Sequence, residues 1–154
     1  MKSSELFLKL QKRMEQYKSK LKPDNDCFYE NDTSIQSIVS KYNLESFNEI
    51  MNSSYEEVDD EVNEEELKDL IHRIDNYFSL YAPDDEKFKE FIKIISIYLV
   101  FIGKKPLHPL GIKFSNGTTV YEKDDYYYCT GKKVFINDEL SLCKYCIAQM
   151  NNIM

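Results

Sequence analysis

Apolar residues recur every three or four positions along most of residues 1–103, which is the spacing of one face of an α-helix. The first stripe runs from Leu6 to Leu21 and ends before a segment rich in Pro, Asp and Asn, which predicts a helix and its termination. A second helix is expected to begin at Thr33, because Gln36 follows three residues later as in a capping box.

Two further helices are predicted from capping residues. Asn43 is a candidate interruption of the second helix. Asn63 precedes three glutamates, which favours an N-cap followed by an acidic first turn. Pro83 lies near the start of the last long helix, and Gly103 suits its C-terminal end. The second half of that helix is apolar nearly all round, so we expect it at the centre of a bundle.

The pattern changes after Gly103. Prolines flank His108 and exclude a continued helix, and Asn116-Gly117 is a strong hairpin signal. We expect two pairs of short strands followed by a short helix. The expected strands cover residues 112–114, 118–122, 126–129 and 134–136, and the helix covers residues 142–150.

These elements predict a mainly α fold with a small β part. Residues 1–103 form a bundle of four to five helices, and residues 104–154 form a β-hairpin and metal-knuckle segment of the α+β kind. A β segment this short buries little core of its own. It therefore needs the helical part to pack on, or a metal ion as a staple, and we expect the two parts to form one structural unit.

Charge and composition narrow the class of protein. The chain has 154 residues, is 42% hydrophobic and 31% charged, and carries a net charge of -7, which excludes disorder and counts against a general nucleic-acid or anionic-membrane binder. No run approaches the ~20 apolar residues of a membrane helix, and the N-terminus lacks a signal-peptide pattern. We therefore expect a cytoplasmic protein without membrane contact, with reduced thiols.

Three cysteines gather near the C-terminus. Cys143 and Cys146 form a Cys-x-x-Cys pair, and Cys129 ends a predicted strand 14 residues before Cys143. With His108, these residues make a Cys₃His set, which is a structural zinc arrangement that leaves no open coordination position. The sequence therefore predicts a metal ligand set of His108, Cys129, Cys143 and Cys146 that adds folding energy and supplies no catalysis.

Other interpretations of these thiols stay open. They are an iron–sulfur cluster, a redox dithiol, and a set of small buried side chains without metal. Cys27 competes with His108 for the fourth ligand position, although a lone cysteine beside Phe28 is more typical of a core residue. His72 lies among charged residues, which indicates the surface.

No familiar catalytic pattern appears. The chain has four glycines and no phosphate-binding Gly-rich loop, nucleophile elbow or His-Glu-x-x-His motif, so no catalytic or organic-cofactor residues are assigned and enzymatic activity is left open. The favoured function is a metal-stabilised interaction or accessory protein with an unidentified protein partner. Nucleic-acid binding is an alternative, because residues 104–154 hold seven lysines against five acids, or +2, beside a tyrosine run at 126–128.

Three segments of the C-terminal part carry a family resemblance. They are residues 108–114, Tyr128-Cys129 and residues 142–148. Together they resemble the C-terminal signature of an uncharacterised archaeal family, found mainly in methanogens and known only as a domain of unknown function. The resemblance implies an anaerobic archaeal cytoplasm, which favours the iron–sulfur alternative, and it implies no activity.

Overall fold

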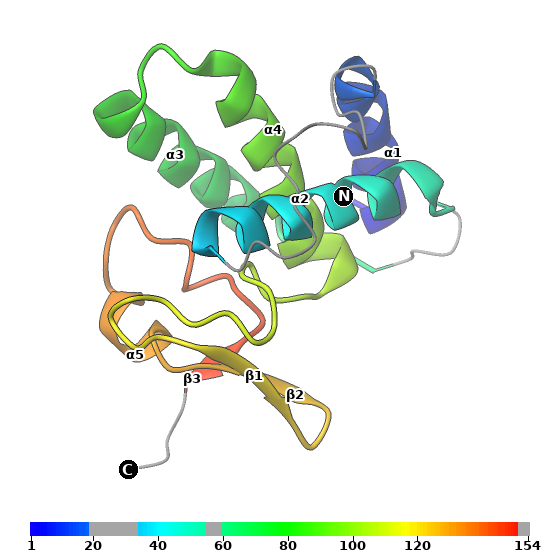
Figure 1. The fold of residues 1–154 in the computed structure, drawn as a ribbon. Coiled ribbons are helices and arrows are strands. Elements are labelled where there is room, and N and C mark those ends of the chain that lie inside the picture. The colour runs from blue at the N-terminus through cyan, green and yellow to red at the C-terminus, as the bar shows by residue number, and fades with distance from the viewer. Residues whose placement is uncertain (19–33, 55–59, 151–154) are drawn as a thin grey trace.

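The computed structural model describes residues 1–18, 34–54 and 60–150, and these form a mainly helical protein with a small C-terminal sheet, as predicted (Figure 1). The long helices are α1 (Ser3–Met14), α2 (Ile35–Asn52), α3 (Glu64–Tyr81) and α4 (Glu86–Ile97). A 3-10 turn (Glu15–Tyr17) extends α1, and a π-helical segment (Tyr98–Gly103) extends α4.

Helix α4 and its π-helical extension lie at the centre of the bundle, in contact with α1, α2 and α3. Their inward side chains are almost fully buried, with Ile94 at 0% and Leu99 at 1% exposed. Each fully buried side chain of this size contributes about 1.5–3 kcal/mol to folding. The apolar second half predicted for this helix is therefore its core-facing part, as expected.

Helices α2 and α3 each begin at a residue whose side chain caps the first turn, α3 at the predicted residue and α2 at a residue that was not predicted. The Asn63 side chain accepts hydrogen bonds from the backbone N–H groups of Glu65 and Glu66, so the predicted N-cap is confirmed. Helix α2 is capped by Ser34, whose hydroxyl accepts from the Ser37 N–H; Thr33, the expected start, lies outside the described residues.

Two other expectations about helix ends and breaks are wrong. Helix α2 passes through Asn43 without interruption, because the apolar face continues to Phe47 and Ile50 on the other side. The C-cap after the π-helical segment is Lys104, which adopts the left-handed conformation with φ 53°, and Gly103 remains inside the segment.

The C-terminal part contains a three-stranded sheet in the order β1-β2-β3. Strand β1 (Val120–Lys123) pairs antiparallel with β2 (Tyr126–Cys129), and the two-residue strand β3 (Gln149–Met150) pairs parallel with β2. The predicted Asn-Gly turn is present, with Gly117 at φ 89°, but only a single bridge joins Lys113 to Thr119 beyond it.

Two predicted elements of this part are wrong. Residues 134–136 were expected to pair with β2, but helix α5 (Lys132–Phe135) and a turn occupy them. Asp124 and Asp125 instead close β1 onto β2, both at positive φ as a two-residue hairpin requires. The free edge of β2 then pairs with β3 from the chain end, so the helix expected over residues 142–150 is absent and turns lead into β3.

The C-terminal part packs on the bundle through polar and apolar contacts. Arg73 of α3 donates from Nη1 to the carbonyl oxygens of Asp138 and Ser141 at 3.1 and 3.0 Å. The Tyr42 hydroxyl of α2 donates to the Pro106 carbonyl at 2.5 Å. A small second core also forms against α2. It consists of Ile112, Val120, Cys129 and Ala148, packed against by Ile35, Ile38 and Val39.

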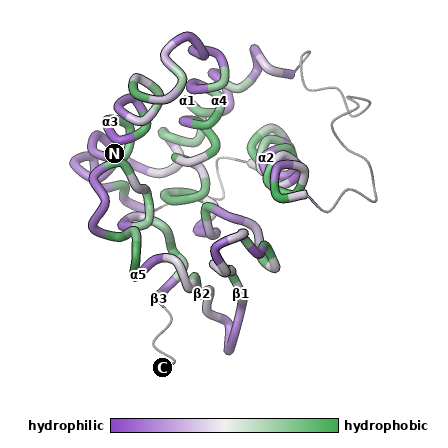
Figure 2. Tube along the Cα trace, turned by 60° about the vertical axis from the view of Figure 1, so that its left-hand side comes forward, coloured by the Kyte–Doolittle hydropathy of each residue, from purple (hydrophilic) through white to green (hydrophobic). Residues whose placement is uncertain are grey.

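Hydrophobic and hydrophilic residues alternate along the helices, and the tip of the β1–β2 hairpin is hydrophilic (Figure 2). No helix among the described residues combines the length and apolarity needed to cross a membrane.

Candidate functional site

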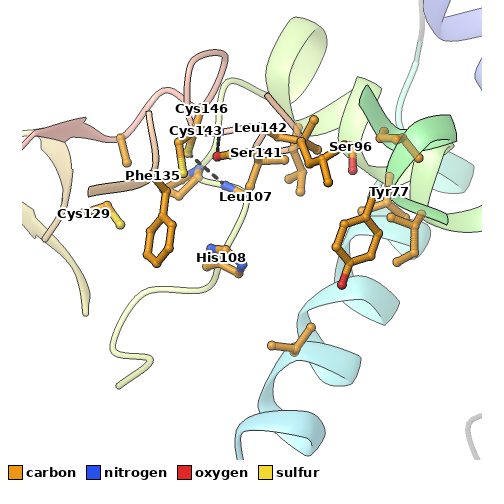
Figure 3. Close-up of a pocket in the computed structure, with 18 of the residues that line it drawn as sticks. Tyr77, Ser96, Leu107, His108, Cys129, Phe135, Ser141, Leu142, Cys143 and Cys146 are labelled. Carbon is orange, nitrogen blue, oxygen red and sulfur yellow. Dashed lines mark hydrogen bonds between the residues drawn. The ribbon is translucent and has the colours of Figure 1, made fainter. Parts of the chain in front are cut away.

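A cavity of about 540 Å³ lies between the bundle and the C-terminal part. All four predicted ligands, His108, Cys129, Cys143 and Cys146, line it (Figure 3). Three segments that are separate in the sequence therefore place their thiol and imidazole groups around one space.

The Cys-x-x-Cys segment is a backbone knuckle. Ser141 Oγ accepts from the Cys143 N–H at 3.0 Å, and the Cys146 N–H donates to the carbonyls of Leu142 and Cys143 at 3.2 and 3.3 Å. This tight turn sets the two thiols beside each other at one end of the cavity, as Figure 3 shows. Both side chains are half-buried.

Hydrogen bonds and charge surround the sulfur of Cys146. The Leu107 N–H donates to it at 3.4 Å, and the Ala148 N–H also donates to it. Burial raises the pKa of this thiol, whereas the two N–H donors and the nearby ammonium of Lys132 act in the opposite direction. N–H donors and a cation favour the thiolate, which is the form that binds metals.

Cys129 and His108 occupy other walls of the cavity. Cys129 is the last residue of β2 and is buried in the small second core. The His108 ring meets Phe114 edge-on at 5.2 Å between centroids, and His108 lines the cavity while part of its surface is exposed. Burial lowers the pKa of His108, which favours the neutral imidazole that ligates metals.

The four groups surround the cavity without converging on one point. No three His, Cys, Asp or Glu side chains within residues 1–18, 34–54 and 60–150 stand close enough to hold a metal ion. In Figure 3 the Phe135 side chain lies between Cys129 and His108. An ion would therefore require these side chains to turn inward.

The other two residues considered from the sequence, His72 and Cys27, are not among the described residues that line this cavity. His72 is exposed on α3 and hydrogen-bonds to Asn76 at 3.1 Å, as expected of a surface residue. Cys27, the competing fourth ligand, lies outside the described residues.

Comparison with known proteins places the chain in a family. A family model described as "Uncharacterized protein conserved in archaea (DUF2115)" matches residues 4–151. The chain belongs to the DUF2115 family. This confirms the archaeal family predicted from the C-terminal segments.

Relatives of this DUF2115 chain come from methanogens. A UPF0305 protein of Methanocaldococcus jannaschii is 40% identical over 112 residues, which cover 72% of this chain and 68% of the relative. A UPF0305 protein of Methanococcus maripaludis strain C6 is 41% identical over 106 residues, which cover 68% of this chain and 64% of the relative. No solved structure matches the chain.

The structure adds two residues to the site that the sequence did not predict. Lys132 and Phe135 line the cavity from α5, where a strand was expected from residue 134. Lys132 donates from Nζ to the carbonyl oxygens of Cys146 and Ala148 at 2.8 and 2.7 Å. The signal available in the sequence was Gly131 before two lysines, which suits the start of a short helix as well as a turn.

Proposed function

We propose that this protein is a cytoplasmic interaction or accessory protein whose C-terminal part is stabilised by a bound metal ion, with zinc favoured by the donor set. The supporting observation is the cavity wall itself, which collects three thiols and one imidazole from separate segments. Cys₃His is a known structural zinc set, and it is closed once all four groups bind.

The surroundings of the thiols support the same proposal. Two backbone N–H groups and the Lys132 ammonium lie around the Cys146 sulfur, and they would stabilise a thiolate bound to an ion. The knuckle presents Cys143 and Cys146 together, so it would supply the first two ligands. Cys129 and His108 would complete the set after turning toward this pair of thiols.

The C-terminal part has a reason to need such a staple. Within its described residues, 104–150, the named elements are strands of four, four and two residues and a helix of four residues. Its own core consists of four buried residues. Small segments with so little buried area are stabilised elsewhere in proteins by metals or disulfides. Metal binding would therefore raise the free energy of unfolding of the protein.

Exposed apolar side chains on the bundle support the interaction role. Leu80 and Tyr81 at the end of α3 are 66% and 68% exposed, and Tyr77 and Phe88 beside them are 47% exposed. Clustered apolar exposure is typical of surfaces that contact partners. Leu80→Ser and Tyr81→Ser should leave the melting temperature and metal content unchanged, whereas a large loss of stability would show that these side chains serve the fold.

The deciding experiment is elemental analysis of the full chain purified without oxygen. We expect about one zinc per chain, no visible absorbance, and a lower melting temperature after chelation. Cys143→Ser and Cys146→Ser should lose the zinc. Protein without tightly held metal, and with a melting temperature that chelator leaves unchanged, would overturn the proposal.

The same preparation separates the alternatives. If the protein contains iron and absorbs visible light, the metal group on these thiols is an iron–sulfur cluster and not zinc. Comparing His108→Ala with Cys27→Ala identifies the fourth ligand, because only the variant that removes a ligand should lower zinc affinity. We expect His108→Ala to do so and Cys27→Ala to bind zinc like the wild type.

A further inference from the structure

The cavity continues beyond the thiols to an apolar end. Helices α3 and α4 and the π-helical segment form this end, through Tyr77, Phe78, Phe88, Ile92, Ile95 and Leu99. Figure 3 shows Tyr77 and Ser96 on the opposite side of the space from the cysteines. The volume of about 540 Å³ lies within the range of small-molecule sites, and such sites are mostly apolar with a few polar groups.

The charge of the cavity wall differs from that of the protein. The chain holds 27 acidic residues and a net charge of -7, yet none of the described residues that line the cavity is Asp or Glu. The basic groups on the wall are Lys132 and His108, both at the thiol end. Lys132 uses two of its three N–H donors on backbone carbonyls, so one donor remains for another acceptor.

We propose that this cavity binds a small apolar organic anion, with its hydrocarbon body against α3 and α4 and its carboxylate or similar head group beside Lys132. The apolar wall provides affinity through burial of hydrocarbon surface. The ammonium provides specificity, since an anionic head group is charge-complementary to the only ammonium among the described residues of the wall. The inference does not require the proposed metal, because neither Lys132 nor the apolar wall is a proposed metal ligand.

The rim of the cavity gives such a molecule a way in. Phe88 and Tyr77 are each 47% exposed, and Phe135 is 39% exposed, so the apolar lining continues to the surface. Large aromatic side chains that line a cavity and also remain exposed gain apolar contact when a ligand fills the space. A molecule of mixed character would therefore enter with its apolar body along these rings.

The test compares two ligands of the same chain length. Decanoate and decanol are titrated calorimetrically into the full chain below their aggregation concentrations, after its metal content has been measured. We expect saturable binding of one decanoate per chain, roughly 10- to 100-fold tighter than decanol, since a hydrogen bond to a charged group discriminates by that order. Absence of saturable binding, or equal affinity for the two ligands, would overturn the inference.

Two lysine variants locate the head group. Lys132→Met keeps an unbranched side chain one atom shorter and removes its charge, and it should abolish the preference for decanoate. Lys133→Met is the matched control, because Lys133 is adjacent, exposed and not among the lining residues, and it should keep the preference. A preference that survives Lys132→Met, or that Lys133→Met abolishes, would place the anion elsewhere.

A cavity-filling variant and a spectroscopic measurement locate the hydrocarbon part of the ligand. Ser96→Leu adds apolar volume at the apolar end and should weaken both ligands at least about 10-fold while the protein stays folded. If this variant unfolds, wild-type protein labelled at isoleucine and leucine methyls provides the answer. Decanoate should shift the resonances of Ile92 and Leu99, and shifts confined to residues away from the cavity would contradict the proposal.

These outcomes are distinct from failure of the metal proposal. If the purified protein holds no zinc but binds decanoate, the ligand proposal stands and the metal proposal is overturned. If the protein holds zinc but binds neither decanoate nor decanol, the metal proposal stands and the ligand proposal is overturned.

Discussion

The backbone N–H of Leu107 donates to the sulfur of Cys146 at 3.4 Å, across 39 residues of sequence. Because His108 is the next residue, this bond fixes the imidazole segment against the Cys-x-x-Cys knuckle. Part of the candidate site is therefore held together by the backbone, before any ion binds.

In metal-free protein the Cys146 thiol should ionise only at a higher pH than an ordinary thiol, because burial raises its pKa. Alkylation of Cys146 by iodoacetamide should therefore rise with pH at a higher midpoint than for an ordinary thiol, as followed by mass spectrometry. Lys132→Met should move the midpoint higher still, since the ammonium lowers the pKa of this thiol. A midpoint at or below the ordinary value would contradict the burial argument.

Arg73 should stabilise the packing of the C-terminal part on the bundle. Its guanidinium is paired with Asp69 at 2.9 Å and donates to two backbone carbonyls, with the side chain only 15% exposed. Arg73→Ala should lower the free energy of unfolding by about 1.5–3 kcal/mol in a denaturant titration. Lys68→Ala, an exposed site on the same helix, is the control and should change it by less than about 0.5 kcal/mol.

The Asn63 cap should contribute to the stability of α3. Asn63→Ala removes the acceptor for two backbone N–H groups and should cost about 1 kcal/mol of unfolding free energy. Asn63→Asp keeps an acceptor at the same place and should stay close to the wild type. Thermal unfolding followed by circular dichroism separates the two, and equal losses would count against a capping role.

Acid should weaken the contact between α3 and the knuckle. Hydrogen bonds from Tyr145 and then Arg73 hold the pKa of Asp69 below its usual range, and the pKa of Tyr145 is raised to about 12, chiefly by burial. A carboxyl whose folded-state pKa is depressed stabilises the protein above its unfolded-state pKa and loses that contribution as pH falls through the folded-state value. Tyr145→Phe should therefore destabilise at pH 7, and its difference from the wild type should shrink on acidification.

Asp69→Asn provides the control for that pH dependence. In this background the side chain at position 69 no longer titrates, so the effect of Tyr145→Phe should change less between pH 7 and 3 than it does in the wild-type background. The measurement is the midpoint of urea unfolding across this range. A difference between Tyr145→Phe and wild type that stays constant with pH would show that Asp69 is not coupled to Tyr145.

The helical part was predictable because its signals are local. The stripe from Leu6, the Asn63 cap and the apolar second half of α4 each depend on neighbours within a few turns, and each is present in the structure. The C-terminal part was less predictable because its strand pairings are not local. Strand β2 pairs with β1 through the Asp124-Asp125 turn and with β3 twenty residues later, and periodicity carries no information about the second partner.

The sequence alone determined the fold class, the archaeal family and the gathering of His108, Cys129, Cys143 and Cys146 as a candidate set. These depend on local periodicity and on residue types at fixed spacings. Only the tertiary structure decided that the four groups surround a shared cavity with an apolar far end and Lys132 on its wall. That arrangement arises from packing the C-terminal part against α3 and α4, and local sequence patterns carry no information about such tertiary contacts.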